Sequence, residues 1–70
     1  MFTKTLTQDG HVRQYLISDV GHEGWEVREE RDARVVRQAF YTDWHRVERA
    51  LAAFSNEVAT LEERGWLTSE

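Results

Sequence analysis

The sequence predicts an α+β fold: a four-stranded antiparallel meander (ββββ) followed by one long C-terminal α-helix packed on one sheet face. Three observations lead to this prediction. Apolar and polar residues alternate over 1–41, Asp9-Gly10 lies between two alternating runs, and apolar residues recur at helical spacing from residue 42 onward. Seventy residues are too few for two domains, so we expect a single small α+β domain over 1–70.

Alternating and β-branched residues predict four strands, at about 2–7, 12–18, 25–30 and 35–41. Between the first two strands, Asp9-Gly10 predicts a two-residue hairpin turn, which places Leu6 opposite Arg13. Between the last two strands we expect a four-residue loop at 31–34, because this stretch is short and polar.

Two arginines face each other in this predicted register. Arg28 lies directly opposite Arg37, and like charges across two strands are destabilising. One interpretation is that Glu26 and Glu30, which flank Arg28 on the same face of its strand, neutralise the pair. The other is that the two guanidiniums, beside Tyr41, form a grip for an anion or for a carboxylate of a partner.

A helix is predicted at about 43–64. Thr42 or Asp43 can cap its first turn, and Gly65 suits the left-handed residue that ends a helix in a Schellman motif. The apolar positions form one stripe along the helix: Trp44, Val47, Leu51, Phe54, Val58 and Leu61. The alternative to a continuous helix is a break near Ser55-Asn56.

The predicted register divides the side chains of the sheet between two faces. The face under the helix stripe carries mainly apolar side chains: Phe2, Leu6, Tyr15, Ile17, Trp25, Val27, Val36 and Phe40. The opposite face combines apolar and polar residues, which suggests a contact surface for a partner. The candidate interaction residues on it are Val12, Leu16, Arg28, Val35, Arg37 and Tyr41.

The predicted helix is longer than the strands that it must cover. About 22 residues of helix extend roughly 33 Å, whereas strands of about six or seven residues reach roughly 20–24 Å. The second half of the helix would therefore leave apolar side chains uncovered, which favours a homodimer. The candidate dimer and helix-end contacts are Phe54, Val58, Leu61, Trp66 and Leu67.

The residue pattern does not point to catalysis or to a metal. The chain has no Cys, which excludes thiolate chemistry and zinc ribbons. His11 and His22 lie at opposite ends of one predicted strand, roughly 25–30 Å apart, too far to share a metal. The adjacent carboxylates Glu29-Glu30 and Glu62-Glu63 point apart. We therefore expect no enzyme activity, no catalytic or metal-ligating residue and no cofactor.

Charge and hydropathy narrow the choice of partner. The net charge of −4 disfavours a protein that binds nucleic acid through bulk charge. No apolar run reaches the ~18 residues of a membrane span, and 1–10 lacks the apolar core of a signal peptide. We therefore expect a cytoplasmic protein without a membrane partner.

The function that these observations favour is that of a small non-enzymatic protein-interaction module, a homodimer with an unidentified protein partner. Two alternatives stay open. The first is a single-stranded nucleic-acid binder that uses Arg28, Arg37 and Tyr41 on one sheet face. The second is a small-anion binder at a groove of the dimer.

Overall fold

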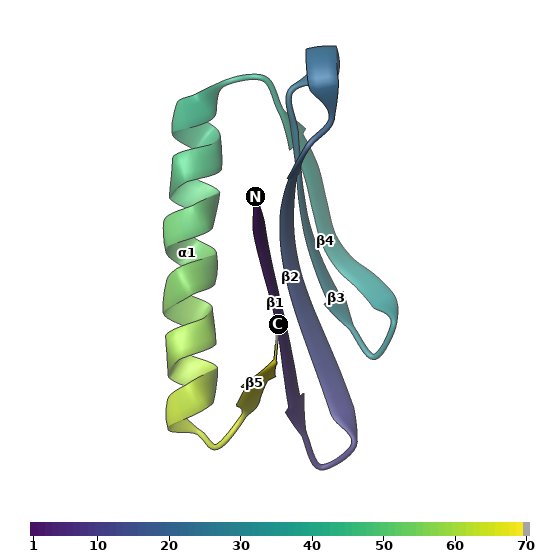
Figure 1. The fold of residues 1–70 in the computed structure, drawn as a ribbon, viewed down its shortest axis with the longest axis vertical. Helices are drawn as coiled ribbons and strands as arrows, with labels where there is room; N and C mark the ends of the chain where they lie inside the picture. The colour runs from purple at the N-terminus through teal and green to yellow at the C-terminus, as the bar shows by residue number, and fades with distance from the viewer. Residues whose placement is uncertain (70) are drawn as a thin grey trace.

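The computed structural model describes residues 1–69, which form one antiparallel sheet with a single long helix on one of its faces (Figure 1). In chain order the elements are β1 (Phe2–Gln8), β2 (His11–Asp19), the short 3-10 helix η1 (Gly21–Glu23), β3 (Trp25–Arg31), β4 (Arg34–Tyr41), α1 (Trp44–Glu63) and β5 (Leu67–Ser69). The sheet order is β4-β3-β2-β1-β5, so β4 and β5 form its edges. The predicted α+β fold is confirmed, and β5 is an additional strand, too short to show a pattern.

The first hairpin has the predicted turn. Asp9 and Gly10 have φ angles of 51° and 81°, and a type I′ turn requires such positive values at both positions. The register of β1 and β2 follows from this turn, and Leu6 pairs with Arg13 as expected.

The second hairpin differs from the prediction. Its turn consists of two residues, Asp32 and Ala33, with φ angles of 51° and 66°, so the expected four-residue loop at 31–34 is wrong. The Asp32 carboxylate accepts the backbone N–H of Val12 at 2.9 Å, which attaches this turn to the start of β2. Ala33 takes a left-handed conformation at a cost of about 1–2 kcal/mol. The turn lacks the Asn-Gly or Asp-Gly pair that marks such turns, so the sequence pattern does not reveal it.

A β-bulge then shifts β4 by one residue relative to β3. The register changes between Glu29 and Glu30, so that Arg37 pairs with Glu29 and Val36 is the additional residue. The expected position of Arg28 opposite Arg37 is therefore wrong. A shift of one residue moves every following side chain of a strand to the other face of the sheet.

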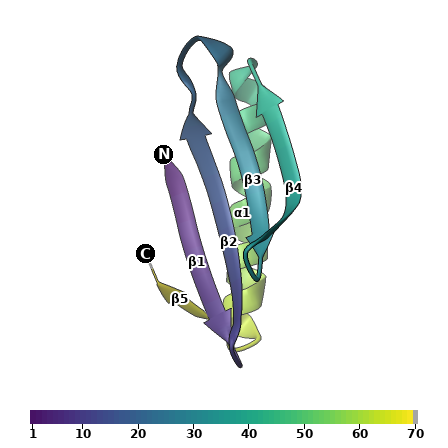
Figure 2. The same ribbon diagram turned by 90° about the vertical axis from the view of Figure 1, so that its right-hand side faces the viewer.

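The bulge changes which side chains of β4 lie under the helix. Arg37, Ala39 and Tyr41 are on the face that α1 covers, whereas Phe40 is on the uncovered face. The expected places of Val36 and Phe40 in the helix-covered core are wrong, since they are 44% and 59% exposed. The expected places of Arg37 and Tyr41 on the uncovered face are wrong too. Figure 2 shows that face toward the viewer, with α1 behind the strands.

Both ends of α1 have the predicted capping residues. The Asp43 side chain accepts the backbone N–H of His45 at 2.9 Å. At the other end Gly65 has a φ angle of 96°, and the Trp66 N–H donates to the Leu61 carbonyl at 3.0 Å. This hydrogen bond joins residues five positions apart, and such a bond at the end of a helix defines a Schellman motif.

The helix is continuous and matches the sheet in length. Its 20 residues extend about 30 Å, and the nine residues of β2 also extend about 30 Å. A break near Ser55-Asn56 and the expected overhang of the helix are therefore both wrong. Phe54, Val58 and Leu61 are at most 6% exposed and belong to the core of their own chain. The buried apolar core consists of Leu6, Tyr15, Ile17, Val27, Val47, Phe54, Val58 and Leu61.

Candidate functional site

The helix-covered face contains one fully buried charge. The Glu29 side chain has no exposed surface, and its oxygens accept hydrogen bonds from Arg31 Nε at 2.9 Å and Arg37 Nε at 2.6 Å. Arg37 Nη2 also donates to Glu57 Oε1 at 2.7 Å. The network therefore connects β3, β4 and α1 through one central carboxylate.

The two arginines keep Glu29 charged. Burial alone raises the pKa of this carboxyl, but the hydrogen bonds and charges of Arg31 and Arg37 outweigh it, so the pKa lies below its ordinary value. Burial lowers the pKa of Arg37, yet its hydrogen bonds to Glu57 and Glu29 raise it above the ordinary value. The network is ion-paired at neutral pH, whereas a general acid requires a carboxyl with a raised pKa.

Sequence reasoning missed Glu29 as a buried residue, although the alternation contains a signal for it. Trp25, Val27 and Glu29 are two residues apart along one strand, so Glu29 follows on the face predicted to lie under the helix. Its neighbour Glu30 points to the other face, where it lies 3.1 Å from Arg28. The two adjacent carboxylates thus point apart, as expected.

A groove lies between β4 and α1; we call it the edge groove. Its volume is about 400 Å³. Arg37 and Tyr41, which were expected on the uncovered sheet face, line this groove together with Phe54, which was expected among the dimer contacts of the helix. The Arg37 guanidinium lies 5.4 Å from the centre of the Phe54 ring, and that of Arg46 lies 5.9 Å from the Tyr41 ring. The lining consists of Val27, Arg37, Gln38, Ala39, Tyr41, Ala50, Ala53 and Phe54.

β4 is an edge strand with exposed apolar side chains. Within residues 1–69 no strand pairs with its outer side, since it is last in the sheet order. Val35, Val36 and Phe40 are 50%, 44% and 59% exposed. The strand at the other edge, β5, has only three residues. A long edge strand with free backbone groups and apolar side chains is a template for a further strand.

A charged row lies along β3 on the uncovered face. Arg28 Nε is 3.1 Å from Glu30 Oε2, and Arg28 Nη1 is 3.6 Å from Glu26 Oε2. These distances support the interpretation that Glu26 and Glu30 neutralise Arg28. They do not neutralise Arg37, which pairs with Glu29 on the other face. Four of the six candidate interaction residues lie on this face: Val12, Leu16, Arg28 and Val35.

The three residues of the nucleic-acid alternative do not share one surface. Arg28 is on the uncovered face, whereas Arg37 and Tyr41 are on the face under α1. Both guanidiniums are ion-paired with glutamates. A single-stranded nucleic acid needs a basic groove with stacking aromatic rings along it, and these residues do not form one.

The candidate contacts at the end of the helix differ in exposure. Phe54, Val58 and Leu61 are buried core residues. The fourth, Trp66, packs against that core, and the Arg13 guanidinium lies 5.0 Å from the centre of its ring. The fifth, Leu67, pairs with Thr7 in the sheet and is 72% exposed. Of the five, Leu67 is the residue with a large accessible surface.

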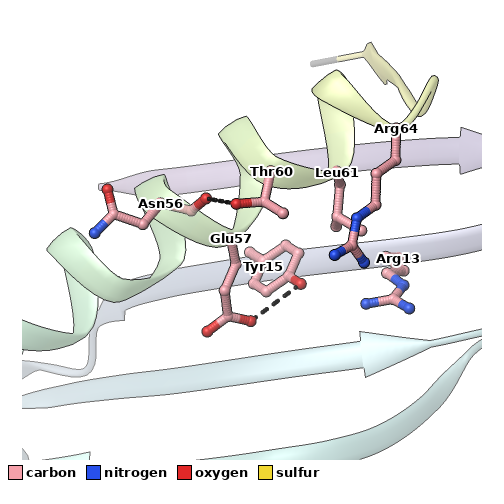
Figure 3. Close-up of a pocket in the computed structure, with 7 residues that line it drawn as sticks. All are labelled: Arg13, Tyr15, Asn56, Glu57, Thr60, Leu61 and Arg64. Atoms are coloured by element: carbon pink, nitrogen blue, oxygen red, sulfur yellow. Dashed lines mark hydrogen bonds between the residues drawn. The ribbon is translucent and has the colours of Figure 1, made fainter.

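A second cavity lies between β2 and the C-terminal half of α1 (Figure 3). Its volume is about 260 Å³. The Tyr15 hydroxyl donates to Glu57 Oε1 at 3.4 Å. Burial raises the pKa of this hydroxyl and outweighs the hydrogen bond from Arg13, so it remains a donor at neutral pH. The lining consists of Arg13, Tyr15, Asn56, Glu57, Thr60, Leu61 and Arg64.

Within residues 1–69, no three His, Cys, Asp or Glu side chains lie close enough together to hold a metal ion. The same part of the chain contains no helix that is both long and apolar enough to cross a membrane. Comparison of the chain with protein-family models, with curated proteins and with solved structures finds no match.

Proposed function

We propose that this chain is a non-enzymatic protein-interaction module that forms a homodimer through the outer edge of β4. One observation carries the proposal: the strand with unpaired backbone groups on its outer side also exposes Val35, Val36 and Phe40. A second copy that extends the sheet would pair those backbone groups and cover the apolar side chains in the same step.

A two-fold axis at Gln38 suits the charges and the faces of β4. Antiparallel pairing around Gln38 places Arg37 across from Ala39 of the second copy, so two like charges do not meet. Both residues lie on the face that α1 covers, which keeps the two helices on the same side of one continuous sheet. Phe40 of each copy then lies across from Val36 of the other, and both lose exposed apolar surface.

Two features support an interaction module over an enzyme. The buried carboxylate Glu29 has two arginine partners and a lowered pKa, whereas acid–base catalysis needs the opposite shift. The cavity between β2 and α1, about 260 Å³, lies below the roughly 300–1,000 Å³ of drug-sized ligand pockets, and the edge groove, about 400 Å³, lies near the lower end of that range.

Size-exclusion chromatography with light scattering tests the proposal. At about 100 µM, where dimers of micromolar affinity are nearly saturated, the wild type is expected to have the mass of a dimer. A double variant, Val35→Lys with Phe40→Lys, is expected to have the mass of a monomer. Each apolar side chain contributes about 1.5–3 kcal/mol on burial, and the dimer loses two of them from each copy, so the double variant weakens the dimer at least about ten-thousandfold.

Leu67→Lys is the matched control, because Leu67 is 72% exposed on the opposite edge of the sheet. This variant is expected to remain a dimer. A wild-type chain that is monomeric at this concentration contradicts the proposal. So does a Leu67→Lys chain that dissociates as readily as the β4 variant.

A further inference from the structure

We propose that the cavity between β2 and the end of α1 binds a small oxyanion through Arg13 and Arg64. Both side chains line the cavity, and neither has a carboxylate partner among the residues that the structure describes. Figure 3 shows Arg64 extending from the end of the helix toward Arg13.

The end of the helix positions both arginines. Arg64 is the C-cap of α1, and its backbone carbonyl accepts a hydrogen bond from Gln8 Nε2 at 2.9 Å. The Arg13 guanidinium lies 5.0 Å from the ring of Trp66, the second residue after that cap. The Schellman motif therefore places a stacking ring for one guanidinium two residues after the residue that supplies the other.

The charge at the cavity is positive, although the whole chain carries −4. Among its described lining residues the one carboxylate is Glu57, which already accepts hydrogen bonds from Arg37 Nη2 at 2.7 Å and from the Tyr15 hydroxyl at 3.4 Å. Arg13 and Arg64 thus contribute two positive charges that no lining carboxylate balances. An anion between them would balance both.

The ligand that fits this cavity is small and carries two negative charges. A guanidinium binds a carboxylate or a phosphate through two parallel hydrogen bonds. A volume of about 260 Å³ lies below the range of roughly 300–1,000 Å³ for drug-sized ligands. The Tyr15 ring and Leu61 offer an apolar wall for the carbon part of a ligand. A phosphate monoester and a dicarboxylate share this chemistry.

This inference is independent of the proposed dimer. None of the residues that line the cavity belongs to β4. A monomeric chain can therefore bind the anion, and a dimer can form without it.

Isothermal titration calorimetry at low ionic strength tests the inference with two probes, inorganic phosphate and succinate. Binding of either probe supports it, and the tighter one identifies the class of ligand. No binding of either up to about 10 mM, where millimolar complexes form, overturns it. Arg13→Gln and Arg64→Gln are each expected to raise the dissociation constant about tenfold or more, because each removes a charge-assisted pair of hydrogen bonds.

Arg34→Gln is the matched control, since it removes the same charge at an exposed position outside the cavity. The dissociation constant of this variant for the tighter of the two probes is expected to stay within about twofold of the wild-type value, because salt screens distant exposed charges. Equal weakening by all three variants would indicate attraction to the net charge and overturn the inference.

Discussion

A carboxylate without exposed surface is costly in a small domain, because removing an ion from water costs several kcal/mol unless partners replace its hydration. Glu29 has such partners in Arg31 and Arg37, whose side chains are 50% and 51% exposed. The guanidiniums can therefore stay partly hydrated while they neutralise the buried group. The network also ties β3 and β4 to α1, since Arg37 contacts Glu57 on the helix.

Glu29→Gln is expected to lower the free energy of unfolding by about 3 kcal/mol near neutral pH, the scale for breaking a buried ion pair. The pH dependence has a definite sign. Because the pKa of Glu29 in the folded chain lies below its unfolded value of about 4.3, its stabilisation is complete above that value. It is lost as the pH falls through the folded pKa. The difference between wild type and variant should therefore shrink in acid.

Urea unfolding followed by circular dichroism, at neutral pH and at about pH 3, measures this difference. Glu63→Gln is the control, because Glu63 is exposed on the helix, and its effect is expected to stay within about 0.5 kcal/mol. A destabilisation by Glu29→Gln that is equally large at both pH values would show that the charge of Glu29 is not what stabilises the fold.

At the scale of elements, short-range signals predict the helix and the first hairpin well. Asp43 and Gly65 occupy the two capping positions, and Asp9-Gly10 forms the expected turn. Each of these features depends on residues a few positions apart, which sequence patterns contain. The second hairpin could not be predicted in this way. Its turn has Ala33 where glycine is usual, and the bulge residue Val36 resembles any other apolar strand residue.

Deletion of Val36 is expected to leave the fold intact and to change the free energy of unfolding by about 1 kcal/mol or less, because removing the extra residue makes the ladder regular. The pairs on both sides of the bulge, including Glu29 with Arg37, would keep their register. Deletion of Gln38 is the matched comparison. It would turn Ala39 and Tyr41 away from α1, and we expect a loss of more than about 2 kcal/mol. Urea unfolding of both variants measures these losses, and equal losses would contradict the assigned bulge.

At the scale of the whole molecule, the position of the uncovered apolar surface differs from the expectation. The sequence predicts two such surfaces, one on the uncovered sheet face and one at the end of an overhanging helix. In the structure the strands are longer than predicted, the helix fits the sheet, and Phe54, Val58 and Leu61 are buried. The exposed apolar side chains of β4 lie at an edge of the sheet instead. Self-association therefore remains the proposal, but the helix end no longer supports it and its proposed site is the edge strand β4.

Mass action gives this proposal a thermal test. When the folded chain dimerises and the unfolded chain does not, a hundredfold rise in protein concentration adds about 2.7 kcal/mol per dimer. Each chain receives half of this stabilisation, about 1.4 kcal/mol. Because each kcal/mol raises the Tm of a domain of this size by about 4–8 °C, Tm should rise by about 5–10 °C. Differential scanning calorimetry over such a range measures the shift. The double variant Val35→Lys with Phe40→Lys should show none, and a constant Tm for the wild type would contradict the dimer.

Patterns in the sequence are enough to predict the types and order of the main elements, the register of the first hairpin and both ends of the helix. These features arise from periodicity and capping, which act between near neighbours in the chain. The register of β4, the pairing of β5 with β1, and the faces on which Arg37, Phe40 and Tyr41 lie depend on contacts between residues far apart in the chain. One extra residue in a strand moves all the side chains that follow it to the other face of the sheet. The contacts of Arg37 with Glu29 and Glu57 therefore depend on the position of the bulge in β4.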